Sequence, residues 1–550
     1  MKKRIWSVLL ALCMALSLLP VGTLADDDGG DGEATVVASD ELIQAGGFPK
    51  QAAGDAALFA SSENLRAAEQ TILLGMEKRE AQIDIEQYGL TEEEADSCIS
   101  KVINENPQLF YVDTSLYYCI DNTVTRIEPI YNSYYTDEDV QRFRNKCDSI
   151  VQTMLRMGLN AEQKCLYLHD YLVTHCHYDP VKPHAAEMYN AYNALVNGVA
   201  VCQGYALAYS YLINLASAPN EDLSAVVVTS DSLNHAWNLL TLDGAQYYVD
   251  CTWDDPLNDG EFYCGHTNFL RSKAGIVSTD HTGNDWLDPA GNNVYSTVSG
   301  GTKYEGYFWS DVAAAIPMTA GLCAYAKKSD NTGVFLRDAA TGTERKVAFP
   351  QQAQTTWYVV GNTSSYWPGC YASVVALDDT FYFNTPTEIY SFSADGVIGS
   401  ALPLAGPLQA GYIYGLRADP QEYTIYYYVG TNPNVGANYE RYGIALSRPA
   451  PVSYFTLLLG IYDDAVNVTV LNGGYESGAK LITAAYDGEG RMLACSVDSV
   501  NVPATESSEI RVSLNLTGAT QIRAFLVDAS TFAPLCDYAV AYFNAGPIRN

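Results

Sequence analysis

The stretch Asn197-Gly-Val-Ala-Val-Cys202-Gln-Gly-Tyr-Ala206 decides how this chain is interpreted. A short apolar run ends at Cys202, and apolar residues then recur at helical spacing as far as Ile213. The pattern therefore predicts that Cys202 begins a helix. Free backbone N–H groups and the positive end of the helix dipole favour a thiolate at such a place. We expect a reactive cysteine.

Two further residues follow in an order that suits thiol chemistry. His235 lies in Asn234-His-Ala-Trp-Asn238, and Asp250 lies in Tyr247-Tyr-Val-Asp-Cys-Thr-Trp-Asp-Asp-Pro256. Cysteine, histidine and aspartate can supply a nucleophile, a base and a group that orients the base. The three residues are the candidate catalytic set.

The segment between the histidine and the aspartate is predicted to form a hairpin with a two-residue turn at Asp243-Gly244. This register places Trp237 opposite Asp250, and His235 becomes a diagonal neighbour of Asp250 at about 7–8 Å. A bulge or an odd-length loop would instead put the two side chains on opposite faces.

At these motifs the chain resembles the transglutaminase-like superfamily in its secreted bacterial form, over about residues 65–290. The resemblance implies a papain-like α+β core, with Cys202 as nucleophile, His235 as base and Asp250 as orienting carboxylate. Cys251 stands where the resemblance leads us to expect Val or Ala. Members of the superfamily cross-link proteins, hydrolyse amides or have lost activity.

A thiol enzyme of this kind needs donors for an oxyanion. The backbone N–H of Cys202 is the first candidate, and the side chains of Tyr192 and Gln203 are the candidates for a second. Trp237 and Trp253 are interpreted as walls of the substrate site, with core packing as the alternative.

The start of the chain predicts export. Lys2-Lys-Arg4, an apolar run and Thr23-Leu-Ala25 are typical of a signal peptide over residues 1–25. Residues 26–60 are predicted to be an acidic disordered leader. We therefore expect a secreted protein, with cell-surface association as a further possibility, and no membrane span.

The rest of the chain divides into four predicted units. They are an α+β lead-in domain at 61–155, a transglutaminase-like catalytic core at 156–295, a β-rich module at 300–450 and an immunoglobulin-like β-sandwich at 451–550. A β-sandwich and a partial propeller are both compatible with the third unit. The expected fold class is thus multidomain, an α+β core with a helical lead-in followed by all-β modules.

Helix and strand signals support this division. Thr91 and Thr136 are expected to cap helices, and Gln108–Val112 is expected to be a strand.

Charge restricts the partners. The chain carries a net charge of −33, and without Lys2, Lys3 and Arg4 the 31 basic residues fall to 28 against 64 acidic ones, a net charge of −36. This charge argues against nucleic acid as a partner. The expected partner is a protein or peptide substrate, cell-wall peptides included. The sequence predicts no oligomeric state.

No metal or other cofactor is expected. Cys176 lies between His175 and His177, but no second ligand pair follows at metal-site spacing. Asp254, Asp255, Asp259 and Glu261 are interpreted as a solvated turn rather than a calcium loop. His169, His266 and His281 are assigned structural roles.

The sequence thus predicts an exported thiol enzyme that acts on peptide or glutamine-type amide bonds through an acyl-thioester. Hydrolysis and protein cross-linking both stay open, and export slightly favours hydrolysis. The alternative is a non-catalytic binding or scaffold protein that has kept a transglutaminase-like module.

Overall fold

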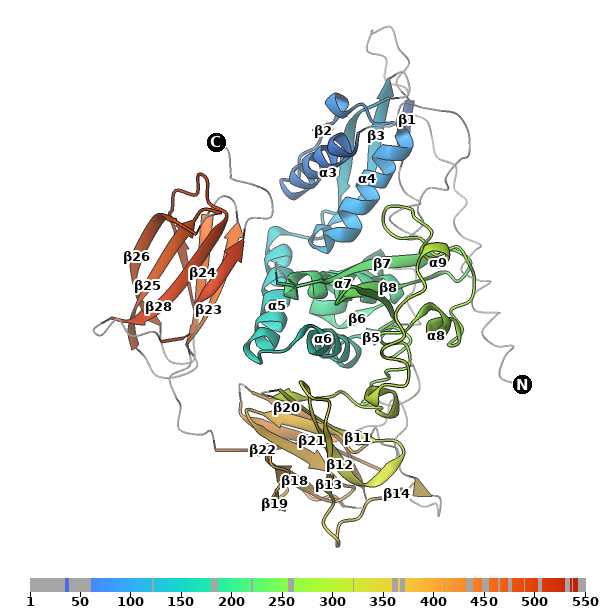
Figure 1. Ribbon diagram of the computed structural model, residues 1–550, viewed down its shortest axis with the longest axis vertical. Coiled ribbons are helices and arrows are strands. Elements are labelled where there is room, and N and C mark those ends of the chain that lie inside the picture. Colours follow the sequence, from blue (N-terminus) through green and yellow to red (C-terminus); the bar gives the residue numbers. More distant parts are fainter. Residues whose placement is uncertain are drawn as a thin grey trace.

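The structure is a computed structural model (Figure 1). It describes residues 35–38, 61–120, 123–179, 186–218, 221–255, 262–319, 321–358, 365–366, 371–409, 411–420, 422–431, 439–447, 455–462, 465–472, 477–488, 490–502, 507–529, 535–536 and 538–542. The predicted signal peptide lies outside these residues. No helix in the described part of the chain combines the length and the apolarity that crossing a membrane requires.

The first unit packs two helices on an antiparallel sheet in the order β1-β3-β4-β2. Ile72, Ile99 and Ile127 are fully buried between the helices and the sheet. The elements are β1 (Thr35–Ala38), α3 (Ser62–Glu77), β2 (Ile83–Asp84), α4 (Glu92–Glu105), β3 (Val112–Ile120) and β4 (Thr123–Tyr131), with 3₁₀ turns η1 (Glu86–Tyr88) and η2 (Pro107–Leu109).

Four residues of the predicted leader are described, and they form β1, whose β-branched residues pair with the edge of β3 from Thr35–Cys119 to Ala38–Leu116. The rest of the predicted leader lies outside the described residues. The expected strand at Gln108–Val112 is wrong except at Val112, where β3 begins. Gln108 and Leu109 belong to the 3₁₀ turn η2, because Pro107 occupies its first position and fixes a helical φ there.

The next helices begin where their caps predict. Capping boxes start α4 at Thr91, α5 (Asp137–Arg156) at Thr136 and α6 (Ala161–His175) at Asn160. Helix α5 belongs to the predicted lead-in domain, but Phe143 of α5 stacks on Tyr211 in the following unit. One continuous hydrophobic core includes both units, so residue 155 marks no break in the packing.

The central unit places one helix on a three-stranded antiparallel sheet (Figure 1). Asn238 donates from Nδ2 to the carbonyl of Ala206 at 2.9 Å and so joins the sheet to that helix. The elements are β5 (His177–Tyr178), η3 (Ala186–Tyr189), the π-helical turn η4 (Asn193–Asn197), β6 (Val199–Ala200), α7 (Cys202–Ala216), β7 (Leu223–Ser230), β8 (His235–Leu242), β9 (Ala245–Val249), α8 (Lys273–Val277), α9 (Val294–Thr297) and η5 (Phe308–Asp311).

A glycine lets the first turn of α7 approach its neighbours closely. A Cβ at Gly204 would lie 2.7 Å from Cβ of Ala200 and 2.9 Å from the carbonyl oxygen of Met188, closer than real Cβ contacts. Gly204 therefore allows the start of α7 to lie directly against the segment before it.

The β8–β9 hairpin has the predicted register. Leu242 pairs with Ala245 and Asn238 pairs with Val249, which leaves Asp243-Gly244 as a two-residue turn. Both turn residues have positive φ, 50° and 80°, as a type I′ turn requires. His235 and Asp250 consequently point to the same face of the sheet.

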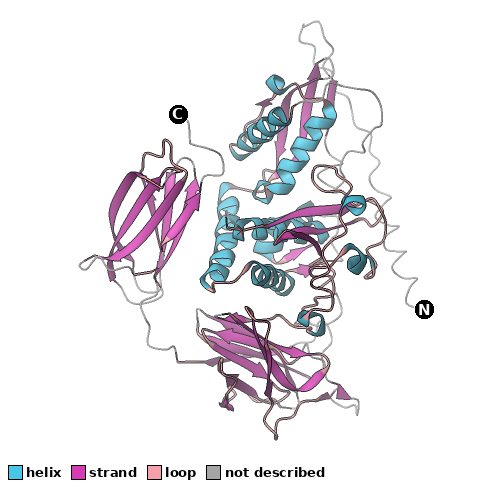
Figure 2. Cartoon of the chain, in the orientation of Figure 1, coloured by secondary structure: helices cyan, strands magenta, loops and turns pink. Residues whose placement is uncertain are grey.

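The 300–450 module consists of successive antiparallel meanders, and strands make up both C-terminal units (Figure 2). In one of them, β17 (Thr380–Asn384) pairs with β16 on one side and with β18 on the other. The strands are β10 (Met318–Thr319), β11 (Leu322–Lys327), β12 (Asp330–Asp338), β13 (Glu344–Ala348), β14 (Trp357–Tyr358), β15 (Ser365–Tyr366), β16 (Val374–Leu377), β17 (Thr380–Asn384), β18 (Ile389–Phe392), β19 (Ile398–Ala401), β20 (Tyr412–Asp419), β21 (Thr424–Gly430) and β22 (Glu440–Ala445).

The last unit contains two antiparallel sheets, ordered β23-β24-β27 and β26-β25-β28-β29. Val468 from the first sheet and Leu481 and Ile522 from the second are fully buried in one shared core. The strands are β23 (Phe455–Tyr462), β24 (Ala465–Asn472), β25 (Ser477–Tyr486), β26 (Met492–Val502), β27 (Ser507–Val512), β28 (Gln521–Asp528) and β29 (Ala539–Tyr542).

Candidate active site

The structure brings the three predicted site residues together. Cys202 is the first residue of α7, His235 is the first residue of β8, and Asp250 directly follows β9. Nε2 of His235 lies 2.7 Å from Oδ2 of Asp250, and the thiol of Cys202 interacts electrostatically with the same imidazole. His235 and Asp250 are buried, whereas Cys202 is half-buried and accessible.

The side-chain carboxylate of Asp250 accepts four hydrogen bonds. Its Oδ2 takes one from His235 and one from Nε2 of His281 at 2.8 Å. Its Oδ1 accepts from the backbone N–H groups of Thr252 at 2.9 Å and Trp253 at 3.1 Å. Burial alone would raise the pKa of Asp250, but the charge of His235 and the two histidine hydrogen bonds hold that pKa well below its usual range.

The imidazole of His235 favours its protonated form. Burial opposes the charge, but the Asp250 carboxylate, its hydrogen bond to His235 and the interaction with Cys202 outweigh it and raise the pKa of His235 to about 10. An imidazolium next to a sulfur atom is the arrangement that stabilises a thiolate.

His281 is a member of this site that sequence reasoning did not identify. It is fully buried and lies 31 residues beyond Asp250, in a loop that a bridge between Leu287 and Thr229 holds against the sheet. No strand or helix pattern surrounds it in the sequence. The structural role assigned to His281 is therefore a positioning role. His281 is hydrogen bonded to the Asp250 carboxylate, which in turn is hydrogen bonded to His235.

Loss of this second histidine should loosen Asp250. We expect His281→Leu to lower the free energy of unfolding by about 1.5–3 kcal/mol, because a hydrogen bond to a charged group disappears. His281→Gln should recover part of the loss, since its amide N–H can still donate. Guanidinium denaturation followed by helical circular dichroism measures the difference, and equal stability of the two variants would contradict this role.

The two tryptophans predicted as walls occupy different environments. Trp237 is 1% exposed and packs edge-on against Trp286, with ring centroids 5.1 Å apart, so it belongs to the core. Trp253 is half-buried and stacks on His235, with centroids 5.0 Å apart and an interplanar angle of 26°. Only Trp253 combines exposure with contact to the predicted base.

The predicted oxyanion role of Tyr192 is not supported by its contacts. The hydroxyl of Tyr192 donates to Oδ1 of Asp139 at 3.0 Å and accepts from Arg142 at 3.1 Å. Its ring stacks on Phe110 with centroids 4.6 Å apart. The hydroxyl hydrogen is thus committed to a carboxylate on α5. Gln203 is buried on the first turn of α7, and its role stays a prediction.

The predicted solvated turn after Asp250 is wrong where the structure describes it. Asp254 is 1% exposed and accepts hydrogen bonds from His169 at 3.2 Å and from Asn268. Asp255 accepts from the hydroxyl of Tyr205 on α7 at 2.6 Å, and burial raises the pKa of Asp255 to about 6. The turn is therefore fixed to two helices. The other two acids of the predicted cluster lie outside the described residues.

Comparisons with known proteins give no family. No protein-family model matches the chain, and no curated protein matches it. Among solved structures, the N-terminal domain of Nup159 is 10% identical with a TM-score of 0.18, over 56% of this chain and 73% of that one. PorZ of Porphyromonas gingivalis is 10% identical with a TM-score of 0.16, over 57% of this chain and 56% of that one. Likeness at these TM-scores assigns neither a fold nor a function.

Proposed function

We propose that the chain is an exported thiol enzyme of the transglutaminase-like class that acts on carboxamide or peptide bonds. One observation carries the proposal. Cys202, at the start of a helix, interacts with the imidazole of His235, and that imidazole lies 2.7 Å from a buried carboxylate. Nε2 of His235 faces Asp250, which leaves Nδ1 as the ring nitrogen for the thiol.

The proposed reaction has two stages. The sulfur of Cys202 attacks the substrate carbonyl carbon, and the carbon–nitrogen bond breaks after His235 gives its proton to the departing ammonia or amine. An acyl-thioester remains on the sulfur. Water or a primary amine then attacks the thioester, loses its proton to His235 and releases the cysteine. Asp250 keeps the imidazole oriented throughout.

Charge that develops on the carbonyl oxygen needs donors. The first N–H groups of a helix have no acceptor within the helix, and the backbone N–H of Cys202 is one of them. We assign it the first position, and Gln203 replaces Tyr192 as the candidate for the second.

The proposal also includes the folds of two units and the location of the substrates. We infer a papain-like arrangement for the central unit and an immunoglobulin-like sandwich for the last one, whose two sheets hold three and four strands. The predicted signal peptide favours substrates outside the cell, including cell-wall peptides. If water is the second reactant the reaction is hydrolysis, and if a primary amine is the second reactant it is cross-linking.

Alkylation by iodoacetamide tests the thiol directly. We expect Cys202 to react faster than the exposed Cys495 from about pH 6 to 8, although Cys202 is less accessible. The imidazolium of His235 supports the thiolate through this range and is lost only as the pH approaches its raised pKa of about 10. Mass spectrometry of the two cysteine peptides gives both rates in one sample.

His235→Ala is the matched variant. In it the advantage of Cys202 over Cys495 should disappear, and alkylation should follow an ordinary thiol, near about pH 8.5. If Cys202 of the unaltered chain reacts more slowly than Cys495 across the range, the enzyme proposal fails. The non-catalytic scaffold would then be favoured.

A further inference from the structure

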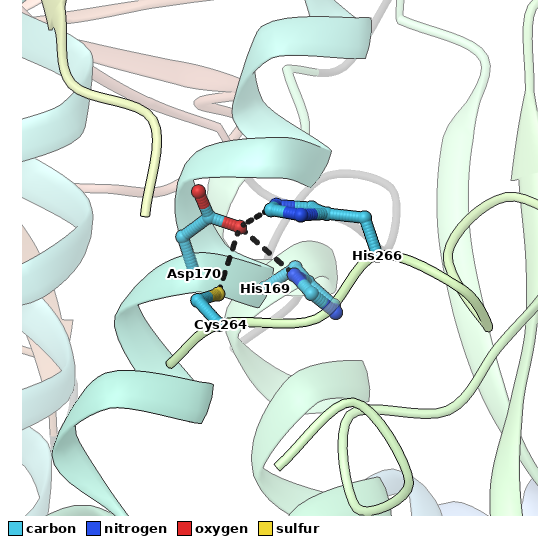
Figure 3. Close-up of side chains that lie close together, drawn as sticks. All are labelled: His169, Asp170, Cys264 and His266. Carbon is cyan, nitrogen blue, oxygen red and sulfur yellow. Dashed lines mark hydrogen bonds and ion pairs between the residues drawn. The ribbon is translucent and has the colours of Figure 1, made fainter. Parts of the chain in front are cut away.

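A second cluster of buried side chains lies outside the candidate active site (Figure 3). His169 and Asp170 project from the middle of α6, and Cys264 and His266 come from residues 262–268, beyond the turn that follows Asp250. We propose that these four residues form a structural zinc site. Each offers one ligand atom, and the four atoms lie within 4.8 Å of one another.

The donor set is one that zinc takes. Two imidazole nitrogens, a thiolate sulfur and a carboxylate oxygen are all established zinc ligands, at about 2.0–2.3 Å, and four of them complete a tetrahedron. Such a tetrahedron separates neighbouring ligand atoms by about 3.3–3.7 Å. Oδ1 of Asp170 lies 2.9 Å from a nitrogen of each histidine and 3.6 Å from Sγ of Cys264. Small movements therefore convert the hydrogen-bonded cluster into a coordination shell.

Groups behind the ligands orient them as they do around zinc. His169 directs Nδ1 into the cluster and Nε2 to Oδ2 of Asp254, and Asp254 is held in turn by Asn268. A carboxylate behind a ligating histidine fixes its tautomer and strengthens it as a ligand. The second oxygen of Asp170 accepts from the backbone N–H of Ile316 at 2.7 Å, so Oδ1 is the oxygen that faces the cluster.

The burial of the cluster indicates a structural metal. His169 and Cys264 are fully buried, and Asp170 and His266 are at most 4% exposed. Four protein ligands in a closed site leave no position for water or substrate. Zinc would form bonds to two nitrogens, one sulfur and one oxygen, and the Cys264 thiol proton would pass to the solvent. Each histidine would coordinate as a neutral imidazole, so the proton on the nitrogen that faces Asp170 would also leave, and only the ring nitrogen facing away from the metal would stay protonated.

The site would join segments that lie far apart in the sequence. Its ligands come from α6 and from the 262–268 segment, and its supporting groups include Asp254, four residues beyond Asp250, and Ile316, just before β10. The ligands are too far apart in the sequence to match a zinc spacing pattern, which explains why sequence reasoning expected no metal.

Native mass spectrometry and metal analysis of the full chain, loaded with zinc and then dialysed, test the proposal. We expect about one zinc per chain. Cys264→Ser and His266→Ala should lose it, Asp254→Asn should weaken binding by about 10–100-fold, and Cys147→Ser, buried in α5 outside the cluster, should keep it. Cobalt in place of zinc should show a thiolate-to-cobalt absorption band that Cys264→Ser removes.

Two results would overturn the proposal. One is a folded unaltered chain that retains no zinc, which would leave the cluster as a hydrogen-bonded core. The other is zinc that survives Cys264→Ser but is lost in His281→Gln, which would place the metal at His235, Asp250 and His281, a group whose ligand atoms are also close together. The first result needs no variant, so a variant that fails to fold does not obscure it. The first result leaves the Cys202 proposal untouched, whereas the second would make His235 and Asp250 metal ligands and would count against both proposals.

Discussion

Replacing Cys202 with alanine is expected to lower turnover by at least about 10³-fold while the protein stays folded. Without the sulfur no acyl-thioester forms, and neither water nor an amine has an activated carbonyl to attack. Cys202 is only half-buried at the start of α7, so its truncation leaves no deep cavity. The helix and the hairpin that carry the site should be unaffected.

Two assays of the same sample measure this loss. One follows the incorporation of a fluorescent primary amine into a glutamine-bearing protein, and the other follows the ammonia released from it. Cys495→Ala is the matched control, because it removes an exposed thiol far from the site in sequence. Full activity in Cys202→Ala would exclude the cysteine as nucleophile, whichever assay responds.

Asp250→Asn should damage both function and stability. An amide at this position disturbs the orientation of His235, and the loss of the corresponding carboxylate in a serine-protease triad costs about 10⁴-fold in turnover. Two histidines donate to one oxygen of Asp250, and both lose their charged partner. Removing one partner from a buried ion pair costs about 3–5 kcal/mol of folding free energy.

The stability loss should depend on pH in a defined way. The lowered pKa of Asp250 stabilises the fold above about pH 3.9, and that contribution is lost as the pH falls through the folded-state value. The raised pKa of His235 stabilises the fold below about pH 6.5, and that contribution is lost as the pH rises through about 10. The variant and the unaltered chain should therefore differ most between about pH 4 and 6.5.

Guanidinium denaturation at several pH values, followed by helical circular dichroism, reports this difference. The signal is selective, because every described α-helix precedes residue 298 and the two β units contribute little to it. A difference that is constant from pH 4 to 10 would mean that the pair carries no charge in the folded protein.

Local patterns in the sequence were enough to predict the geometry of the proposed triad. The Asp243-Gly244 turn sets the hairpin register, and that register brings His235 and Asp250 to one face. The capping boxes at Thr91 and Thr136 likewise begin the helices that they predict. In each case the interaction that decides the structure spans only a few residues.

Contacts between segments that are distant in the sequence could not be predicted from local patterns. His281 reaches Asp250 through a loop without periodicity, and Asp254 becomes buried only because α6 presents His169 to it. The hydroxyl of Tyr192 donates to Asp139 on α5, and no spacing in the sequence indicates this pairing. Residues 35–38 gain a partner strand only when the edge of β3 is folded.

The position of the site along the chain has a consequence for the order of folding. The four described residues that donate hydrogen bonds to the Asp250 carboxylate all lie before residue 282, so the triad can assemble while the β modules are still being synthesised. Asp170, by contrast, acquires its bond from Ile316 only when the segment before β10 arrives. A chain truncated after the central unit should thus form its cysteine–histidine pair early, and the β modules should add kinetic protection against unfolding later.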